Sequence, residues 1–246
     1  MKGLDYSSGR PDLKAVKRDG FDFVARYLFP PTKGVTLAES IAIRAAGLGI
    51  VVIYESYAGR ALEGQTAGIA DGKAALAFAR NIEFPDSRPI YFAVDFAATA
   101  AQQPVINAYL KGAASAIGAA RVGVYGSYYV VERCYANKTA QWFWQTRGWS
   151  NGKVSAHTHF YQYLNGQAVA GANVDLNESK QNDFGAWEVE VIKPVVTKPV
   201  VTPVAKPNVA MQWALDNKIV DKGIDPNAPV TWHSFIWTLY RARGKK

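Results

Sequence analysis

Apolar and polar positions follow two alternating patterns over the first 192 residues. Short runs rich in Val, Ile, Phe and Tyr predict strands, and segments with apolar residues three or four positions apart predict helices. The predicted strands are residues 2–6, 22–28, 50–55, 89–95, 121–126, 141–145, 158–163 and 172–176. The predicted helices are residues 10–19, 36–48, 65–81, 102–119 and 127–136. Because strands and helices alternate along the chain, we expect a parallel sheet covered by helices.

Eight predicted strands in a domain of this length favour the α/β class, as a (β/α)₈ TIM-like barrel with shortened late helices. The alternative is an open doubly wound sheet, in which a glycine-rich phosphate loop would follow the first strand. Ser7-Ser-Gly9 stands at that place and lacks the G-x-G-x-x-G spacing, so the barrel is preferred.

A proline-rich segment divides the chain into three parts. Residues 193–207 carry prolines at 194, 199, 203 and 207, which predicts an extended, semi-rigid linker between a barrel domain (1–192) and a small helical module (208–246). Two short helices are expected in the module, at 208–220 and 231–243. Roughly forty residues seldom form a stable core alone. The module is therefore expected to dock on the barrel, pair with a copy from another chain as an oligomer, or bind a wall polymer.

The positive charge lies mostly in the C-terminal part. The chain has a net charge of +8, and residues 193–246 hold nine Lys or Arg and three Asp, which is +6. This imbalance suits an anionic wall polymer as partner, whereas the barrel does not have the charge of a nucleic-acid binder. No apolar run approaches the roughly 18 residues of a membrane span, and the first residues show no secretory signal. The single Cys134 excludes an internal disulfide.

Four acidic residues each close an apolar, strand-like run: Asp5, Glu55, Asp95 and Asp175. In our assignment they end strands one, three, four and eight. Barrel enzymes carry catalytic groups at the C-terminal ends of strands, so all four acids are expected at one mouth. Glycoside hydrolysis needs one protonated and one ionised carboxyl, and crowded carboxylates raise at least one pKa. A single acid at a strand end is more often a helix cap or an ion-pair partner, but four in the same phase weaken that interpretation.

Aromatic residues accompany the acids and can stack on sugar rings. The candidates for substrate binding are Tyr6, Tyr54, Tyr91, Tyr125, Trp144 and Tyr163, with Tyr125 and Trp144 preferred. Ordinary core and rim packing is the alternative for each of them. His157 and His159 share one face of a strand without a third ligand nearby, so no metal site and no cofactor are expected.

Several motifs together resemble a known family. They are Gly3-Leu-Asp-Tyr-Ser-Ser-Gly9, Val122-Gly-Val-Tyr-Gly-Ser127, Tyr161-Gln-Tyr163 with Gly166, and Val174-Asp-Leu-Asn177. These resemble the opening, fifth and closing strands of the family 25 glycoside hydrolases, the barrel lysozymes. Ile53-Tyr-Glu55 and Ile90-Tyr-Phe-Ala-Val-Asp95 are more similar to the glycoside-hydrolase-like branch of that superfamily, long described as a domain of unknown function. The resemblance covers about residues 1–187 and implies a TIM-like barrel that acts on cell-wall glycan.

One departure from the family bears directly on activity. Family 25 lysozymes end the fourth strand with Asp-x-Glu, where the Glu is the proton donor, but this chain has Asp95-Phe-Ala97. The resemblance therefore leaves Glu55 as the replacement acid, with Asp95 or Asp175 as its ionised partner. Ala97 also motivates the alternative of a non-catalytic barrel that binds cell-wall carbohydrate. A third alternative is a different hydrolase, an amidase or peptidase, at the same mouth.

The C-terminal part resembles a single S-layer-homology-like module, through Ala210–Ile219, Asp225–Thr231 and the helix that runs to Tyr240. Barrel, linker and wall-binding module together look like a phage endolysin of a Gram-positive host. We therefore expect a peptidoglycan hydrolase that cleaves a glycosidic bond of the wall. It would be made in the host cytoplasm without a signal peptide and act on the wall after release.

Overall fold

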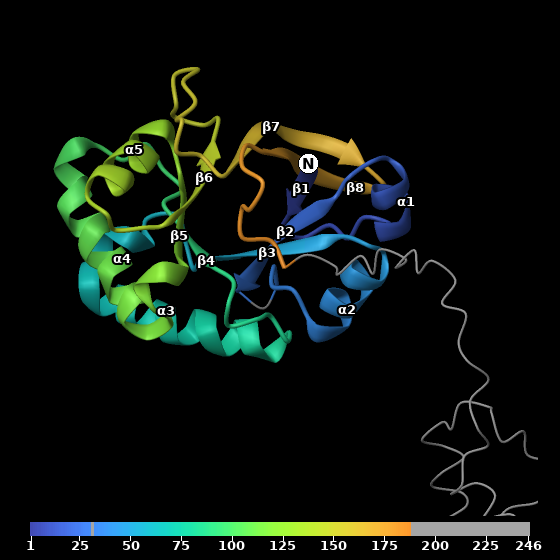
Figure 1. The fold of residues 1–246 in the computed structure, drawn as a ribbon, viewed down its shortest axis with the longest axis horizontal. Helices are drawn as coiled ribbons and strands as arrows, with labels where there is room; N and C mark the ends of the chain where they lie inside the picture. The colour runs from blue at the N-terminus through green and yellow to red at the C-terminus, as the bar shows by residue number, and fades with distance from the viewer. Residues whose placement is uncertain (31, 188–246) are drawn as a thin grey trace, which may run out of the picture. The chain divides into compact units, whose positions relative to one another are not determined.

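The computed structural model describes residues 1–30 and 32–187 (Figure 1). The predicted linker and C-terminal module lie outside these residues. The strands are β1 (Lys2–Tyr6), β2 (Phe23–Phe29), β3 (Gly49–Tyr54), β4 (Ile90–Ala93), β5 (Val122–Gly126), β6 (Trp142–Thr146), β7 (Phe160–Val169) and β8 (Ala172–Ser179). The α-helices are α1 (Leu13–Arg18), α2 (Leu37–Ala45), α3 (Gly64–Asn81), α4 (Gln103–Ile117) and α5 (Tyr128–Ala136), joined by short 3₁₀ turns η1 (Arg60–Glu63), η2 (Ala100–Gln102) and η3 (Ala119–Arg121).

The eight strands form a closed barrel in chain order, which confirms the expected α/β barrel. Strands β1 to β7 are parallel to their neighbours, whereas β8 runs antiparallel to both β7 and β1. The expectation of a parallel eighth strand was therefore wrong. Only Ala170 and Gly171 separate β7 from β8, both with positive φ (49° and 85°). A two-residue connection of this kind makes a hairpin, while a parallel crossover needs about a dozen residues or more.

The five predicted helices are present with shorter ends. Helix α1 begins at Leu13 rather than residue 10, because Asp12 is its N-cap and accepts hydrogen bonds from the amides of Lys14 and Ala15. In the described residues no α-helix follows β6 or β7, so the helical layer is incomplete on that side of the barrel. None of the described helices is long and apolar enough to cross a bilayer.

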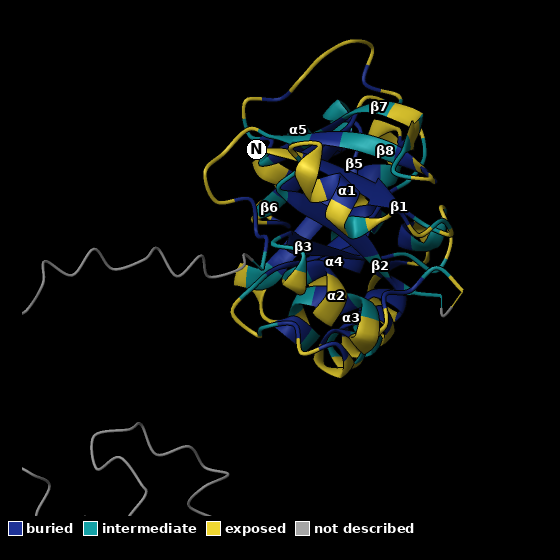
Figure 2. Cartoon of the chain, turned by 90° about the vertical axis from the view of Figure 1, so that its right-hand side faces the viewer, coloured by how far each residue is buried: buried dark blue, intermediate teal, exposed yellow. Residues whose placement is uncertain are grey.

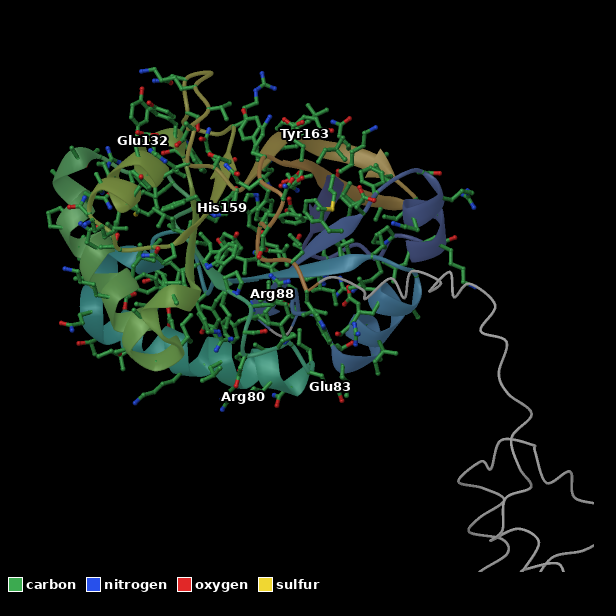
Figure 3. The ribbon with its side chains drawn as sticks, in the orientation of Figure 1. Arg80, Glu83, Arg88, Glu132, His159 and Tyr163 are labelled. Atoms are coloured by element: carbon green, nitrogen blue, oxygen red, sulfur yellow. The ribbon has the colours of Figure 1, made fainter. Side chains whose placement is uncertain are left out.

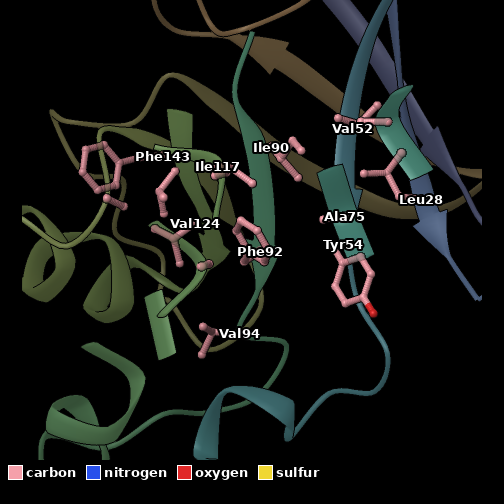
Figure 4. Packing of buried hydrophobic residues seen from close by; sticks show 14 of the residues in the cluster. Leu28, Val52, Tyr54, Ala75, Ile90, Phe92, Val94, Ile117, Val124 and Phe143 are labelled. Carbon is pink, nitrogen blue, oxygen red and sulfur yellow. The ribbon is translucent and has the colours of Figure 1, made fainter. Parts of the chain in front are cut away.

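The core has two layers on opposite faces of the barrel wall. The outer layer lies between the strands and the helices, and Figure 4 shows Leu28, Val52 and Phe92 within it. The inner layer fills the barrel and consists of Phe23, Ala25, Val51, Ile53, Tyr91, Ala93, Tyr125, Trp144, Phe160, Phe184 and Ala186. Figure 2 shows that the parallel strands in the middle of the barrel are mostly buried, whereas β7 and β8 carry intermediate and exposed residues, as the helices and loops do.

Side chains along each strand point alternately into and out of the barrel, and the inward positions continue up to the barrel mouth. On β3 the inward positions are Val51 and Ile53, and on β4 they are Tyr91 and Ala93. Because side chains alternate with period two, the next inward positions are Glu55 and Asp95, each just beyond its strand. The same parity places Tyr27 two positions after Ala25 on β2. The apolar inner face thus ends on polar groups at the C-terminal side of the strands.

Candidate active site

The four predicted acids surround one point at the barrel mouth, which the Tyr27 hydroxyl marks. Burial raises the pKa of Tyr27, and the charges of Asp5, Glu55, Asp95 and Asp175 raise it further. Asp5 and Asp175 are directly opposite each other in the β1–β8 register. The structure therefore brings the four acids together. Tyr27 was not among our candidates, although its inward parity on β2 was a usable signal.

Asp175 lies at the mouth, but at a different position in its strand from the one we expected. It lies in the middle of β8 rather than at a strand end, and β8 runs back toward the bottom of the barrel. Its carboxylate accepts hydrogen bonds from the amide of Gly166 (2.8 Å), from Asn165 Nδ2 (2.9 Å) and from Gln162 Nε2 (3.2 Å). The β7–β8 hairpin thus supplies both the acid and two of the donors that orient it.

Asp5 is the most deeply buried of the four, at 4% exposure. Its Oδ2 accepts hydrogen bonds from Asn177 Nδ2 (2.7 Å) and Gln162 Nε2 (2.9 Å). Burial, followed by the charge of Asp175, raises the pKa of Asp5 to about 7, although these two hydrogen bonds and Arg26 act in the opposite direction. A substantial fraction of Asp5 is therefore protonated at neutral pH.

Two amide side chains that our sequence analysis missed hold this cluster in place. Gln162 Oε1 accepts from the Tyr125 hydroxyl (2.9 Å) and from Thr146 Oγ1 (2.9 Å), so its NH₂ group faces Asp5 and Asp175. Trp144 Nε1 donates to Asn177 Oδ1 (2.9 Å), so the Asn177 NH₂ group faces Asp5. The signal was present in the motifs that contain Gln162 and Asn177, since both residues share the inward parity of their strands.

Glu55 and Asp95 form the second pair of acids, and both are partly buried. Burial raises the pKa of Glu55, the charge of Asp95 raises it further, and Lys33 lowers it. Burial also raises the pKa of Asp95, and the charge of Asp175 adds a smaller increase. Lys33 and the nearby Tyr125 hydroxyl act in the opposite direction and lower the pKa of Asp95. The Asp95 charge thus favours the protonated form of Glu55.

Lys33, which was not among our candidates, brings a cation to this pair from the β2–α2 loop. Its Nζ lies 5.2 Å from the centre of the Tyr27 ring. The loop is anchored by Arg26, which is fully buried, donates from Nη2 to the carbonyl of Lys33 (3.0 Å) and pairs through Nε with Glu39 (2.8 Å). No residue pattern pointed to Lys33, because its position depends on this buried ion pair. Ala97 is exposed and leaves no carboxylate two residues beyond Asp95.

Most of the aromatic candidates do not reach the mouth, which corrects our expectation. Tyr6 follows Asp5 and Tyr54 precedes Glu55, so alternation turns both rings to the outer face. The Tyr6 hydroxyl donates to Glu39 (3.0 Å), and Tyr54 stacks on Phe29 within the outer layer (Figure 4). Tyr91 and Trp144 are buried inside the barrel, where the Tyr91 hydroxyl donates to the carbonyl of Phe184 (2.8 Å). None of these rings is open to a sugar.

The last two aromatic candidates differ from each other. Tyr125 lies at the site, because its hydroxyl donates to Gln162 and is close enough to Asp95 to lower its pKa. Tyr163 is a partly buried residue of β7 (Figure 3) and follows the inward Gln162 at a register shift. Among the described residues, the side-chain and backbone donors to Asp5 and Asp175 are Gln162, Asn165, Gly166 and Asn177, so Tyr163 does not belong to this network.

The two histidines lie away from the acids. His157 and His159 precede β7 and line a surface groove of about 550 Å³ together with Tyr135, Lys138 and other residues before β6. This groove is at the N-terminal ends of the strands, opposite the mouth. Within residues 1–30 and 32–187, no group of three or more His, Cys, Asp or Glu side chains is arranged to hold a metal ion.

The chain is similar in sequence and in structure to a mycobacterial protein. It is 27% identical over 199 residues to the Mycobacterium tuberculosis protein named "Putative peptidoglycan hydrolase Rv2525c", with 75% of this chain and 82% of that protein covered. The crystal structure of Tat-secreted Rv2525c with L-tartrate matches with a TM-score of 0.73 and 26% identity, over 76% of this chain and 98% of that one.

Two more distant structures from Streptococcus pneumoniae share the fold. The modular autolysin LytC matches with a TM-score of 0.52 and 20% identity, over 72% of this chain and 46% of that one. GHIP, a glycosyl hydrolase 25, matches with a TM-score of 0.52 and 13% identity, over 74% and 88%. The family profile described as "Rv2525c-like, glycoside hydrolase-like domain" matches residues 14–179, which is most of the barrel. The chain therefore belongs to the Rv2525c-like family of glycoside hydrolase-like domains.

Proposed function

We propose that this protein is a peptidoglycan hydrolase that cleaves a glycosidic bond of the bacterial wall by carboxylate acid/base catalysis. The observation that carries the proposal is the convergence of four acids around Tyr27 at the open end of the barrel. Three of them, Asp5, Glu55 and Asp95, have raised pKa values. The name of the mycobacterial relative supports the substrate class, as does the structure of LytC in complex with a synthetic peptidoglycan ligand.

In this proposal Glu55 is the proton donor and Asp95 its ionised partner. Lys33 favours the charged form of both acids, and the Tyr125 hydroxyl adds a hydrogen bond that favours the charged form of Asp95. Its charge in turn keeps the proton on Glu55. Glycoside hydrolysis uses such a division, in which one carboxyl protonates the leaving oxygen and the other acts as base or nucleophile. Asp175 and Asp5 complete the acidic mouth, and Asp5 acts from beneath through its charge and its hydrogen bonds.

The test is the release of reducing ends from purified peptidoglycan. Glu55→Gln and Asp95→Asn are each expected to lower the rate by at least about 100-fold, because each removes one of the two proton-transfer partners. Glu83→Gln is the matched control: Glu83 is an exposed carboxylate at the edge of the molecule just after α3, before the N-terminal end of β4 (Figure 3). Activity that survives both Glu55→Gln and Asp95→Asn would refute this assignment.

A non-catalytic glycan-binding barrel is the second candidate, and Ala97 is the observation that favours it. The Glu that family 25 lysozymes carry two residues after the aspartate is replaced here by Ala97, which is exposed and has no carboxylate. Sedimentation of the protein with insoluble walls, without reducing ends even at high protein concentration, is expected for this candidate. Mass spectrometry of the soluble products separates glycosidase from amidase or peptidase cleavage.

We also propose that residues 193–246 act as linker and wall-binding module, and that the whole chain is a phage endolysin. The basic charge of this part supports binding to an anionic wall polymer. In this proposal the protein is made in the host cytoplasm and reaches the wall after release. Lysis of Gram-positive cells from outside by the purified chain, but not by Glu55→Gln, is the expected result.

A further inference from the structure

The loop between β6 and β7 presents one large aromatic residue in an unfavourable conformation. Trp149 is 44% exposed and has a φ of 55°, in the left-handed region that side chains other than Gly, Asn and Asp seldom adopt. An L-residue with a Cβ adopts this conformation only with steric strain. Figure 1 shows the loop standing out from the body of the barrel after β6. An exposed ring held in such a conformation points to a role outside the folded core.

The conformation of the loop is fixed by the residue that follows Trp149. Ser150 is fully buried, and its Oγ donates to the carbonyls of Thr146 (2.6 Å) and Gly148 (3.2 Å) in a shared hydrogen bond. The same oxygen accepts from the amide of Tyr128 at the start of α5 (2.8 Å). Trp149 itself takes part in none of the ring pairs found among the described residues. The hydrogen bonds of Ser150 therefore fix the backbone beside Trp149, and the indole is left partly open to solvent without a ring partner among the described residues.

A continuous set of hydrogen bonds joins this loop to the acids. The amide of Gly148 donates to Thr146 Oγ1 (3.2 Å), which donates to Gln162 Oε1 (2.9 Å). Gln162 then donates to both Asp5 and Asp175. The amide of Arg147 also donates to the carbonyl of Gln162 (2.9 Å). Trp149 is thus one residue from a chain that ends on the acids, on the same side of the barrel as the mouth.

We propose that Trp149 is the stacking platform of a glycan subsite on the rim of the mouth, where its indole packs against the apolar face of a sugar ring. This rests on the proposed function, since the neighbouring acids define the ligand as a glycan strand. A large, flat and rigid ring with a single polar N–H suits such a contact, because little conformational freedom is lost on binding. The subsite lies beside β6 and β7, so it would hold the glycan on the Asp5–Asp175 side of the mouth.

The test measures binding of a soluble tetrasaccharide of alternating N-acetylglucosamine and N-acetylmuramic acid to the full chain by calorimetry. Trp149→Gly is expected to raise the Kd about tenfold, which corresponds to about 1.4 kcal/mol, and Trp149→Phe by no more than about threefold. The melting temperature of Trp149→Gly should equal or exceed that of the wild type, since Gly accepts a positive φ. A loss of binding without a loss of stability separates the ring from the fold.

Asn151→Gly is the matched control, because Asn151 also has a positive φ (50°) in the same loop but carries no ring. It should bind the tetrasaccharide like the wild type. Equal affinity of Trp149→Gly and the wild type, an equal loss in Asn151→Gly, or no binding by the wild type overturns the inference. If Trp149→Gly binds tenfold more weakly but the wild type releases no reducing ends, the subsite is supported and the proposed hydrolysis is refuted. If the wild type releases reducing ends but Trp149→Gly binds with unchanged affinity, the hydrolysis is supported and the subsite is refuted.

Discussion

At the scale of single residues, Asp5 combines the deepest burial with a carboxylate neighbour. Its pKa is about 7 in the folded protein and near 3.8 in the unfolded chain. The folded state therefore binds more protons than the unfolded state between these values, and the stability that depends on Asp5 falls as pH rises from about 4 to about 7. Below this window Asp5 is protonated in both states and does not change the stability. Above it Asp5 is ionised in both states, and the loss of stability from burying its charge has reached its full value.

Asp5→Asn tests this directly. An amide at this position can present its oxygen to Gln162 and Asn177 without a charge, so the variant should match the wild type near pH 4. It should be more stable by on the order of 4 kcal/mol near pH 8, since the pKa of Asp5 differs by about three units between the two states. Urea denaturation across this pH range measures the difference. A stability difference for Asp5→Asn that stays constant across this pH range would contradict the explanation.

Lys33 sets the proton affinities of the catalytic pair in our proposal, because it lowers the pKa of both Glu55 and Asp95. Lys33→Met should raise both values, so both limbs of the pH–rate profile should move to higher pH by a few tenths to about one unit. Lys138→Met removes a charge from the opposite groove and should leave the profile in place. A lower rate without a shift of either limb would show that Lys33 contacts substrate rather than tuning the acids.

At the scale of elements, the closest helix contact depends on glycine. Helices α3 and α4 approach at Gly68, where a Cβ would lie 1.9 Å from the carbonyl oxygen of Tyr109. Helix propensity alone would make Gly68→Ala stabilising by about 1 kcal/mol. Because backbone must move, we expect a destabilisation of about 2 kcal/mol or more instead. Ala70→Gly, on the exposed face of the same helix, should cost only the propensity, about 1 kcal/mol, as thermal denaturation can show.

Strand alternation and helix periodicity were enough to predict the barrel and the five helices, because each depends on local spacing. The direction of β8 was not predicted, although the two-residue connection before it excludes a crossover. The positions of Asp5, Glu55 and Asp95 followed from strand ends, whereas Asp175 lies in the middle of its strand. Gln162 and Asn177 stand in motifs that we had used only to identify the resemblance. Lys33 and Trp149 could not be found this way, since the buried pair of Arg26 and Glu39 places one and a three-way hydrogen bond at Ser150 places the other.

At the scale of the whole chain, charge is divided between the barrel and the C-terminal part. Residues 193–246 carry +6 of the net +8, so exchange of four of their basic residues for Gln (Arg241, Arg243, Lys245 and Lys246) removes half of the net charge. Binding to walls that carry anionic polymers should weaken, and its dependence on salt should flatten, since screening acts on the charges that were removed. Turnover of the soluble tetrasaccharide should not change, because the acids at the mouth are untouched.

The control for this prediction carries the same change in net charge on the barrel. Lys14, Lys73, Lys111 and Lys138 are all exposed, and their exchange for Gln also removes four positive charges. If the basic excess acts as one diffuse field, both variants should lose the same wall affinity in sedimentation assays. If the C-terminal part contacts the polymer directly, the tail variant should lose several-fold more. Equal losses would therefore assign the wall attraction to overall charge and leave residues 193–246 without a specific part in it.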